Sequence, residues 1–124
     1  MLNRSLLLGA TAGLLFTGSM HTHLVKAEPA VDGSVVAAPR QIRLWFNEAP
    51  EVALSAATIV TADNAPVGTV KMAATDDSLS VAGPVTASLK PGVYQVVWRT
   101  GSKDGHAVRG KYTFTYDTTT TAKP

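Results

Sequence analysis

A period-two alternation of apolar and polar residues is the feature that most constrains this fold. In Gln41–Phe46 and again in residues 108–116, apolar side chains fall on one side of an extended chain and mostly polar ones on the other. This period is typical of strands with one buried and one solvated face. No stretch after the first 20 residues sustains a helical period. We therefore predict an all-β fold, with Ile42, Leu44, Phe46, Tyr112 and Phe114 facing inward and Trp45 outward.

Further short strands are expected between Gly, Pro, Asn and Asp residues that favour turns. In the strand after Pro91-Gly92, Tyr94 and Trp98 share one face, while Val93 and Val97 share the other, so both faces are expected to be at least partly covered. Several strands at near-regular spacing favour an antiparallel sandwich or a Greek-key β-barrel. The additional strands are predicted at residues 24–27, 57–61, 69–72, 78–82 and 93–100.

The N-terminus has the composition of a secretory signal peptide. Arg4 precedes an uncharged apolar run over residues 5–16, and small polar residues follow it. The run is much shorter than the roughly 20 residues that a membrane-spanning helix needs, so we expect cleavage rather than anchoring. Cleavage after Ser19 satisfies the preference for small residues better than cleavage after Met20. We expect residues 1–20 to be the signal, residues 21–117 one domain, and residues 118–124 a disordered polar tail.

Charge and cysteine content exclude several classes of function. Removal of residues 1–20 takes away only Arg4, so the formal net charge of +2 becomes +1, which does not indicate nucleic acid or an anionic membrane surface as a partner. The chain has no cysteine, so the fold depends on its core without disulfides, and a thiolate metal site is excluded. Any metal must be held by nitrogen, oxygen or thioether ligands.

The three histidines are the residues with the clearest chemical potential. His21 and His23 lie where the mature chain would begin, and His106 lies near Asp104 in the segment between the last two strands. In an extended segment residues two apart point to the same side, so Asp104 and His106 would face one point. An Asp-Gly-His sequence is also common as a plain turn, and terminal histidines often belong to a frayed end.

A new N-terminus at His21 would add a ligand that is invisible in the side-chain sequence. The α-amine and imidazole of His21 can chelate one metal ion, and Asp104 and His106 can complete a tetragonal set of nitrogen and oxygen donors. That set suits Cu(II), which also heads the divalent affinity order. With His21 first, the amine, two deprotonated backbone amides and the His23 ring could instead wrap Cu(II) without Asp104 or His106. Without that cut, His21 could still bind a metal through its ring.

Five segments together make the chain similar to the CopC family of periplasmic copper-binding proteins. The similarity extends over essentially the whole chain after residue 20, and the order and spacing of the segments carry it. The segments are His-Thr-His-Leu-Val-Lys-Ala-Glu-Pro-Ala at 21–30, Ala-Pro at 38–39, Leu-Trp-Phe-Asn-Glu at 44–48, Leu-Lys-Pro-Gly-Val-Tyr at 89–94 and Val-Trp-Arg-Thr-Gly-Ser-Lys-Asp-Gly-His at 97–106.

The resemblance implies a cupredoxin-like Greek-key fold and a role in copper homeostasis or resistance. It implies that His21, Asp104 and His106 hold Cu(II), that Glu48 is a carboxylate near the site, and that the cut follows Met20. It also implies a monomeric periplasmic protein that sequesters copper or carries it to a partner such as an inner-membrane copper importer. Some family members have a methionine-rich Cu(I) loop, but only Met72 would remain here, so the resemblance is to members with a Cu(II) site alone.

Two other functions fit parts of the sequence. A copper-dependent oxidative enzyme can also use an N-terminal histidine chelate, although the polysaccharide-attacking type usually has a flat aromatic surface, for which Trp45 is the sole outward tryptophan candidate. An Ig-like structural domain would make the histidines incidental. No histidine falls in a recognised Ser or Cys nucleophile motif, so hydrolysis is not indicated. We expect a binding protein rather than an enzyme.

Overall fold

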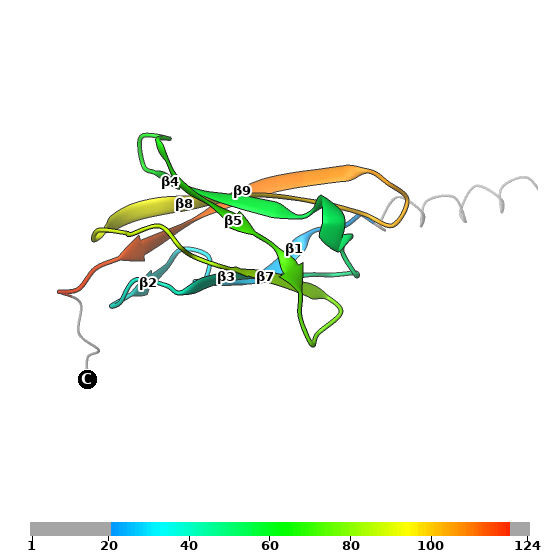
Figure 1. The fold of residues 1–124 in the computed structure, drawn as a ribbon, viewed down its shortest axis with the longest axis horizontal. Coiled ribbons are helices and arrows are strands. Elements are labelled where there is room, and N and C mark those ends of the chain that lie inside the picture. The colour runs from blue at the N-terminus through cyan, green and yellow to red at the C-terminus, as the bar shows by residue number, and fades with distance from the viewer. Residues whose placement is uncertain (1–20, 120–124) are drawn as a thin grey trace, which may run out of the picture.

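In a computed structural model of the protein, residues 21–119 are described, and they form two facing β-sheets. Figure 1 shows the two layers and the long β8–β9 hairpin. In strand order, one sheet contains β1 (Leu24–Glu28), β3 (Gln41–Phe46), β7 (Ser80–Pro84) and β6 (Ala73–Ala74). The other contains β2 (Gly33–Val35), β9 (Ala107–Tyr116), β8 (Gly92–Gly101), β4 (Ala56–Thr61) and β5 (Pro66–Lys71), and a 3-10 turn, η2 (Val52–Leu54), precedes β4.

The all-β prediction is confirmed, and of its two alternatives the two-sheet sandwich is the one formed. Within residues 21–119, no helix has both the length and the apolar character needed to cross a membrane. The predicted signal peptide lies outside the described residues, as does the tail from residue 120 onward. Thr119 is described and bonds to Asp117 through its amide and its hydroxyl.

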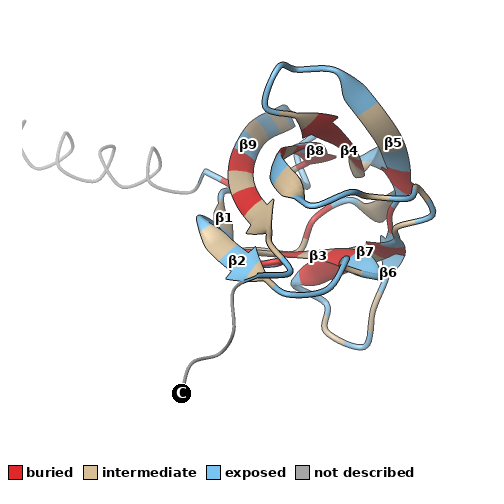
Figure 2. Ribbon diagram, turned by 90° about the vertical axis from the view of Figure 1, so that its left-hand side faces the viewer, coloured by how far each residue is buried: buried red, intermediate tan, exposed pale blue. Residues whose placement is uncertain are grey.

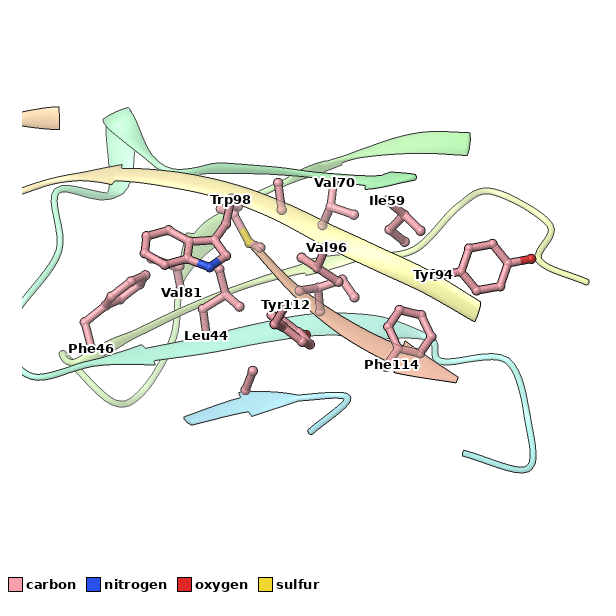
Figure 3. Packing of buried hydrophobic residues seen from close by; sticks show 14 residues of the cluster. Leu44, Phe46, Ile59, Val70, Val81, Tyr94, Val96, Trp98, Tyr112 and Phe114 are labelled. Atoms are coloured by element: carbon pink, nitrogen blue, oxygen red, sulfur yellow. The ribbon is translucent and has the colours of Figure 1, made fainter. Parts of the chain in front are cut away.

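The core lies between the sheets and is made by the inward positions of the alternating strands. Figure 2 shows the buried segments on the facing sides of the two layers. Phe46 from one sheet meets Trp98 from the other edge to face, with ring centroids 5.3 Å apart, and Figure 3 shows this contact. Ile42, Leu44, Phe46, Tyr112 and Phe114 are all buried, as their alternation predicts.

Met72 belongs to this core and is 5% exposed. Its sulfur is therefore a packing atom inside the sandwich, where a thioether commonly fills irregular space. Met72 is the one methionine expected in the mature chain, and its buried sulfur is not accessible as a ligand for Cu(I).

Three details of the strands differ from the sequence predictions. The outer face of β8 is open rather than covered, because Val93 and Val97 are 47% and 40% exposed. The sheets are not wholly antiparallel, since β2 pairs with β9 in parallel, Gly33 opposite Phe114. The strands β2 and β6 were not predicted because two or three residues are too short to show a period.

The hairpin of β8 and β9 carries the segment with Asp104 and His106. Its ladder runs without a shift from Gly92 opposite Tyr116 to Gly101 opposite Ala107. The connecting loop is therefore confined to residues 102–106 and lies at the end of the sandwich where β1 begins (Figure 1). This rigid pair of strands brings the loop beside the N-terminal segment.

Candidate metal centre

A tight turn, not an extended chain, brings Asp104 and His106 together. The amide of Gly105 donates to the carbonyl of Ser102, and the amide of Ser102 donates to the carbonyl of His106, both at 2.9 Å. Gly105 has a φ of 92°, a conformation that glycine adopts without steric cost. The predicted convergence therefore occurs, but the predicted cause was wrong, because the chain reverses at Gly105 instead of alternating.

The two side chains form an exposed ion-pair geometry within this turn. Nδ1 of His106 lies 2.9 Å from Oδ2 of Asp104, and the two side chains are 80% and 68% exposed. The other carboxylate oxygen, Oδ1, accepts bonds from the Ser102 hydroxyl and from the His106 amide. The Ser102 hydrogen bond above all, and then that of His106, lower the pKa of Asp104 far below its ordinary value. Asp104 is thus held as a carboxylate that faces an imidazole.

Asn47 fixes the path of the N-terminal segment beside this loop. Its Nδ2 donates to the carbonyl of His21 at 2.9 Å, and its Oδ1 accepts from the amide of His23 at 2.7 Å. Its own amide donates to the carbonyl of His23 at 3.1 Å. One side chain therefore binds the backbone on both sides of Thr22, so residue 21 is held although no strand includes it.

Thr22 is the inward-facing residue of this segment. It is 6% exposed, and its hydroxyl donates to Oε2 of Glu48 at 2.6 Å. Glu48 thus contacts the N-terminal segment directly. The resemblance had implied only that Glu48 is a carboxylate near the copper site. Its contact is with the residue next to His21.

A hollow of about 550 Å³ at this end of the sandwich is lined by His21, Asp104 and His106 together. Ser102 and Arg109 also line it. Neither Glu48 nor His23 is among its lining residues, and Nδ1 of His23 instead lies 3.3 Å from the carbonyl of His21. Across residues 21–119, no three His, Asp or Glu side chains stand close enough together to hold a metal ion as they are placed here. The fold gathers the three predicted ligands around one hollow, with two of them already in contact.

Sequence reasoning missed the residues that support these ligands. Asn47 and Thr22 act across 24 to 26 positions of sequence, so no local pattern marks them. Ser102 was detectable in principle, because a Ser two residues before an Asp in a turn often bonds its carboxylate.

The fold is shared with solved structures of similar sequence. CopC from Methylosinus trichosporium OB3b superposes with a TM-score of 0.71 at 33% identity, over 78% of this chain and 94% of that one. PcoC, a methionine-rich copper resistance protein from Escherichia coli, gives a TM-score of 0.67 at 34% identity, over 78% and 99% of the two chains. The architecture is therefore the two-sheet, cupredoxin-like sandwich of CopC.

Sequence comparison gives the same family. The CopC domain matches residues 24–117. Protein YobA of Escherichia coli K12 is 39% identical over 95 residues, which are 76% of this chain and 77% of YobA. Copper resistance protein C of Escherichia coli is 33% identical over 123 residues, 93% of this chain and 97% of that protein. The chain belongs to the CopC family.

Proposed function

We propose that this protein binds a single Cu(II) ion in the periplasm, after export and cleavage before His21, and sequesters it or passes it on. The observation that carries the proposal is the convergence of His21, Asp104 and His106 on one hollow. The names of relatives such as copper resistance protein C support copper as the metal.

The donors around the hollow suit Cu(II). Two imidazoles, a carboxylate and a terminal amine are nitrogen and oxygen ligands of the kind that tetragonal Cu(II) prefers. Asp104 supplies a negative charge, and its hydrogen bonds from Ser102 and His106 lower its pKa further below the ordinary carboxyl value. The Asp104–His106 pair occupies donor atoms in the metal-free chain, so a bound ion would replace this contact rather than add to it.

Cleavage after Met20 would place the amine where the site needs it. The bonds from Asn47 hold the carbonyl of His21, so an amine on the same residue would lie close to the hollow. Two of the ligand groups would then come from one residue, and the backbone of that residue is held by a side chain from the strand end after β3.

Oxidation-state preference follows from the same donor set. Cu(I) prefers thiolate or thioether ligands, the chain has no cysteine, and Met72 is buried in the core. We therefore assign the protein to the Cu(II)-only type of the family. Reduction would loosen the ion, which suits a holder that releases copper to a partner.

Binding rather than catalysis is the activity that these features support. Trp45, the outward tryptophan, lies on β3 and does not line the hollow, and Lys26 and Arg43 stand 4.3 and 4.6 Å from its ring centroid. Its ring is occupied by these cations, so it offers no flat aromatic platform beside the hollow.

The test is copper binding by the protein purified from the periplasm after export. Intact mass gives the first residue, and metal analysis with electron paramagnetic resonance gives the stoichiometry and the nitrogen ligation of Cu(II). We expect a chain that begins at His21 and holds one Cu(II), with binding greatly weakened in His106→Ala. A correctly processed chain that retains no Cu(II) in competition with a weak chelator would overturn the proposal.

A further inference from the structure

The outer face of the larger sheet carries cations without any acid among its strands. Strands β2, β4, β5, β8 and β9 contain no Asp or Glu, whereas their exposed positions include four basic residues, Lys71, Arg99, Arg109 and Lys111. The small net charge of the chain conceals this, because the acidic residues lie in loops and on the other sheet. The fold therefore gathers basic side chains on the strands of the larger sheet, apart from the acidic ones.

The register aligns three of these cations in one row across four strands. Lys71 pairs with Ala56, Ala56 with Arg99, and Arg99 with Arg109. Side chains directly opposite each other share a face of the sheet, so the two arginines stand side by side. Like charges in such positions repel and destabilise a sheet that has no counter-charge. The ion pairs described in residues 21–119 join Arg43 to Asp76 and His106 to Asp104, and neither includes a cation of this face.

A hollow of about 320 Å³ is lined by both arginines and by residues of β4 and β8. Its lining includes Arg99, Arg109 and the small or apolar side chains of Ala56, Thr58 and Val97. Ala56 separates Lys71 from Arg99 in the row, so the hollow exists because a small residue stands between larger ones. Its dimensions suit one side chain with an apolar stem and an anionic end. Val97 is 40% exposed and borders it.

We propose that this face docks a partner protein through an acidic segment, with one carboxylate side chain seated between Arg99 and Arg109. Arginine binds a carboxylate through two parallel hydrogen bonds and is enriched at protein interfaces. The exposed Val97 adds apolar contact beside Arg99, two residues away on the same strand. A layer of lipid headgroups would engage the net charge but would leave the hollow and Val97 unused.

Arg109 also lines the hollow that holds His21, Asp104 and His106. A partner seated on this face would therefore reach the rim of the candidate copper site. Docking itself needs no metal, so the test uses the metal-free protein, and its outcome is independent of copper binding.

The test measures binding of a fluorescent peptide of eight glutamates to the isotope-labelled protein, by anisotropy and by amide chemical shifts. We expect shifts on the outer faces of β4, β8 and β9, with affinity that falls as salt rises. The double variant R99Q/R109Q should bind at least about tenfold more weakly, because it removes both carboxylate forks. The control R40Q/K90Q removes the same charge elsewhere and should lose less than about threefold. Equal losses in the two variants, or shifts confined to another surface, would overturn the proposal.

Two further measurements separate side-chain recognition from charge alone. R99K/R109K keeps the charge but loses the planar fork, so we expect about threefold weaker peptide binding or more. Vesicles of phosphatidylglycerol and phosphatidylethanolamine should not retain the protein at about 150 mM salt. Vesicle binding without peptide binding would show that the face serves a membrane and would overturn the acidic-protein assignment. Unfolding temperatures equal to that of the parent chain establish that each variant is folded.

Discussion

The hydroxyl of Thr22 donates a 2.6 Å hydrogen bond to Oε2 of Glu48, across 26 positions of sequence. Thr22 is buried, so Thr22→Val would leave the carboxylate without this donor at nearly unchanged volume. We expect unfolding free energy to fall by about 1 to 2 kcal/mol, measured by urea titration of the metal-free protein. An unchanged stability would show that the bond contributes nothing to holding the segment.

The same contact predicts how Glu48 affects copper. Because Glu48 binds the neighbour of His21 and does not line the hollow, it should act by positioning and not as a ligand. Glu48→Gln, which keeps an acceptor for Thr22, should weaken Cu(II) by less than about threefold, whereas Asp104→Asn should weaken it by more than about tenfold. Competition titrations against a chromophoric chelator measure the Cu(II) affinity of both variants. A larger loss of affinity in Glu48→Gln than in Asp104→Asn would show that Glu48 is a metal ligand.

Asn47→Ala removes two of the three bonds that fix the backbone around Thr22. We expect Cu(II) affinity to fall by about tenfold, since outer-shell supports commonly contribute this much to a metal site. Asn47→Asp is the matched control, because its carboxylate can still accept from the His23 amide but cannot donate to His21. An intermediate loss is expected there. If the parent chain, Asn47→Ala and Asn47→Asp bind Cu(II) equally, contacts other than those of Asn47 hold the backbone around Thr22.

His106 and His23 should differ in their effect on Cu(II). His106 lines the hollow, whereas His23 does not, and the His23 amide and carbonyl are occupied by Asn47. A wrap of Cu(II) by the amine, the first two backbone amides and the His23 ring would have to break the bond from the His23 amide to Asn47. His106→Ala should therefore cost far more affinity than His23→Ala. The reverse order in a competition titration would establish the terminal wrap.

Much of this arrangement was foreseeable from sequence, for reasons that differ between its parts. Ile42, Leu44 and Phe46 alternate, so their burial follows from the period alone. Asp104 and His106 were detectable as a pair because they are two positions apart in the sequence, although a turn at Gly105 and not an extended chain brings them into contact. Asn47 was not detectable in this role, because its partners become neighbours only after β1 and β3 pair.

Copper binding should weaken as the pH falls from 8 to 5. Imidazole and amine nitrogens must lose their protons to bind a metal, and an ordinary imidazole titrates near about pH 6.5. Asp104 behaves differently, because the Ser102 and His106 hydrogen bonds lower its pKa in the folded chain. A lowered folded pKa means that its contribution is present above the ordinary carboxyl value of about 3.9 and is lost only below it.

Asp104 therefore stays anionic throughout the range from pH 8 to pH 5. We expect Asp104→Asn to bind Cu(II) more weakly at every pH in this range, with a pH profile of the same shape as that of the parent chain. A profile whose midpoint moves in Asp104→Asn would contradict this expectation. Titrations at fixed ionic strength measure both curves.

At Gly83 the backbone of β7 lies close to the backbone of β5 in the other sheet. A Cβ at this position would lie 2.1 Å from the carbonyl oxygen of Lys71, an atom that cannot move without disturbing β5. Gly83→Ala should therefore destabilise the protein by about 3 kcal/mol. Gly92→Ala is the control, since its nearest neighbours lie 3.9 Å away. Equal thermal unfolding of the two variants would contradict this account of the packing.

The loop over residues 102–106 is closed by its own hydrogen bonds, and none of its side chains belongs to the buried core. Its chemistry is therefore uncoupled from folding: Asp104 and His106 can be exchanged for other donors at little cost to the sandwich. In the proposed copper site, this short loop on a rigid hairpin would be completed by one residue at the new terminus left by cleavage, and selection or design could change its metal preference. The same five residues are also short enough to transplant onto another β-hairpin of matching register.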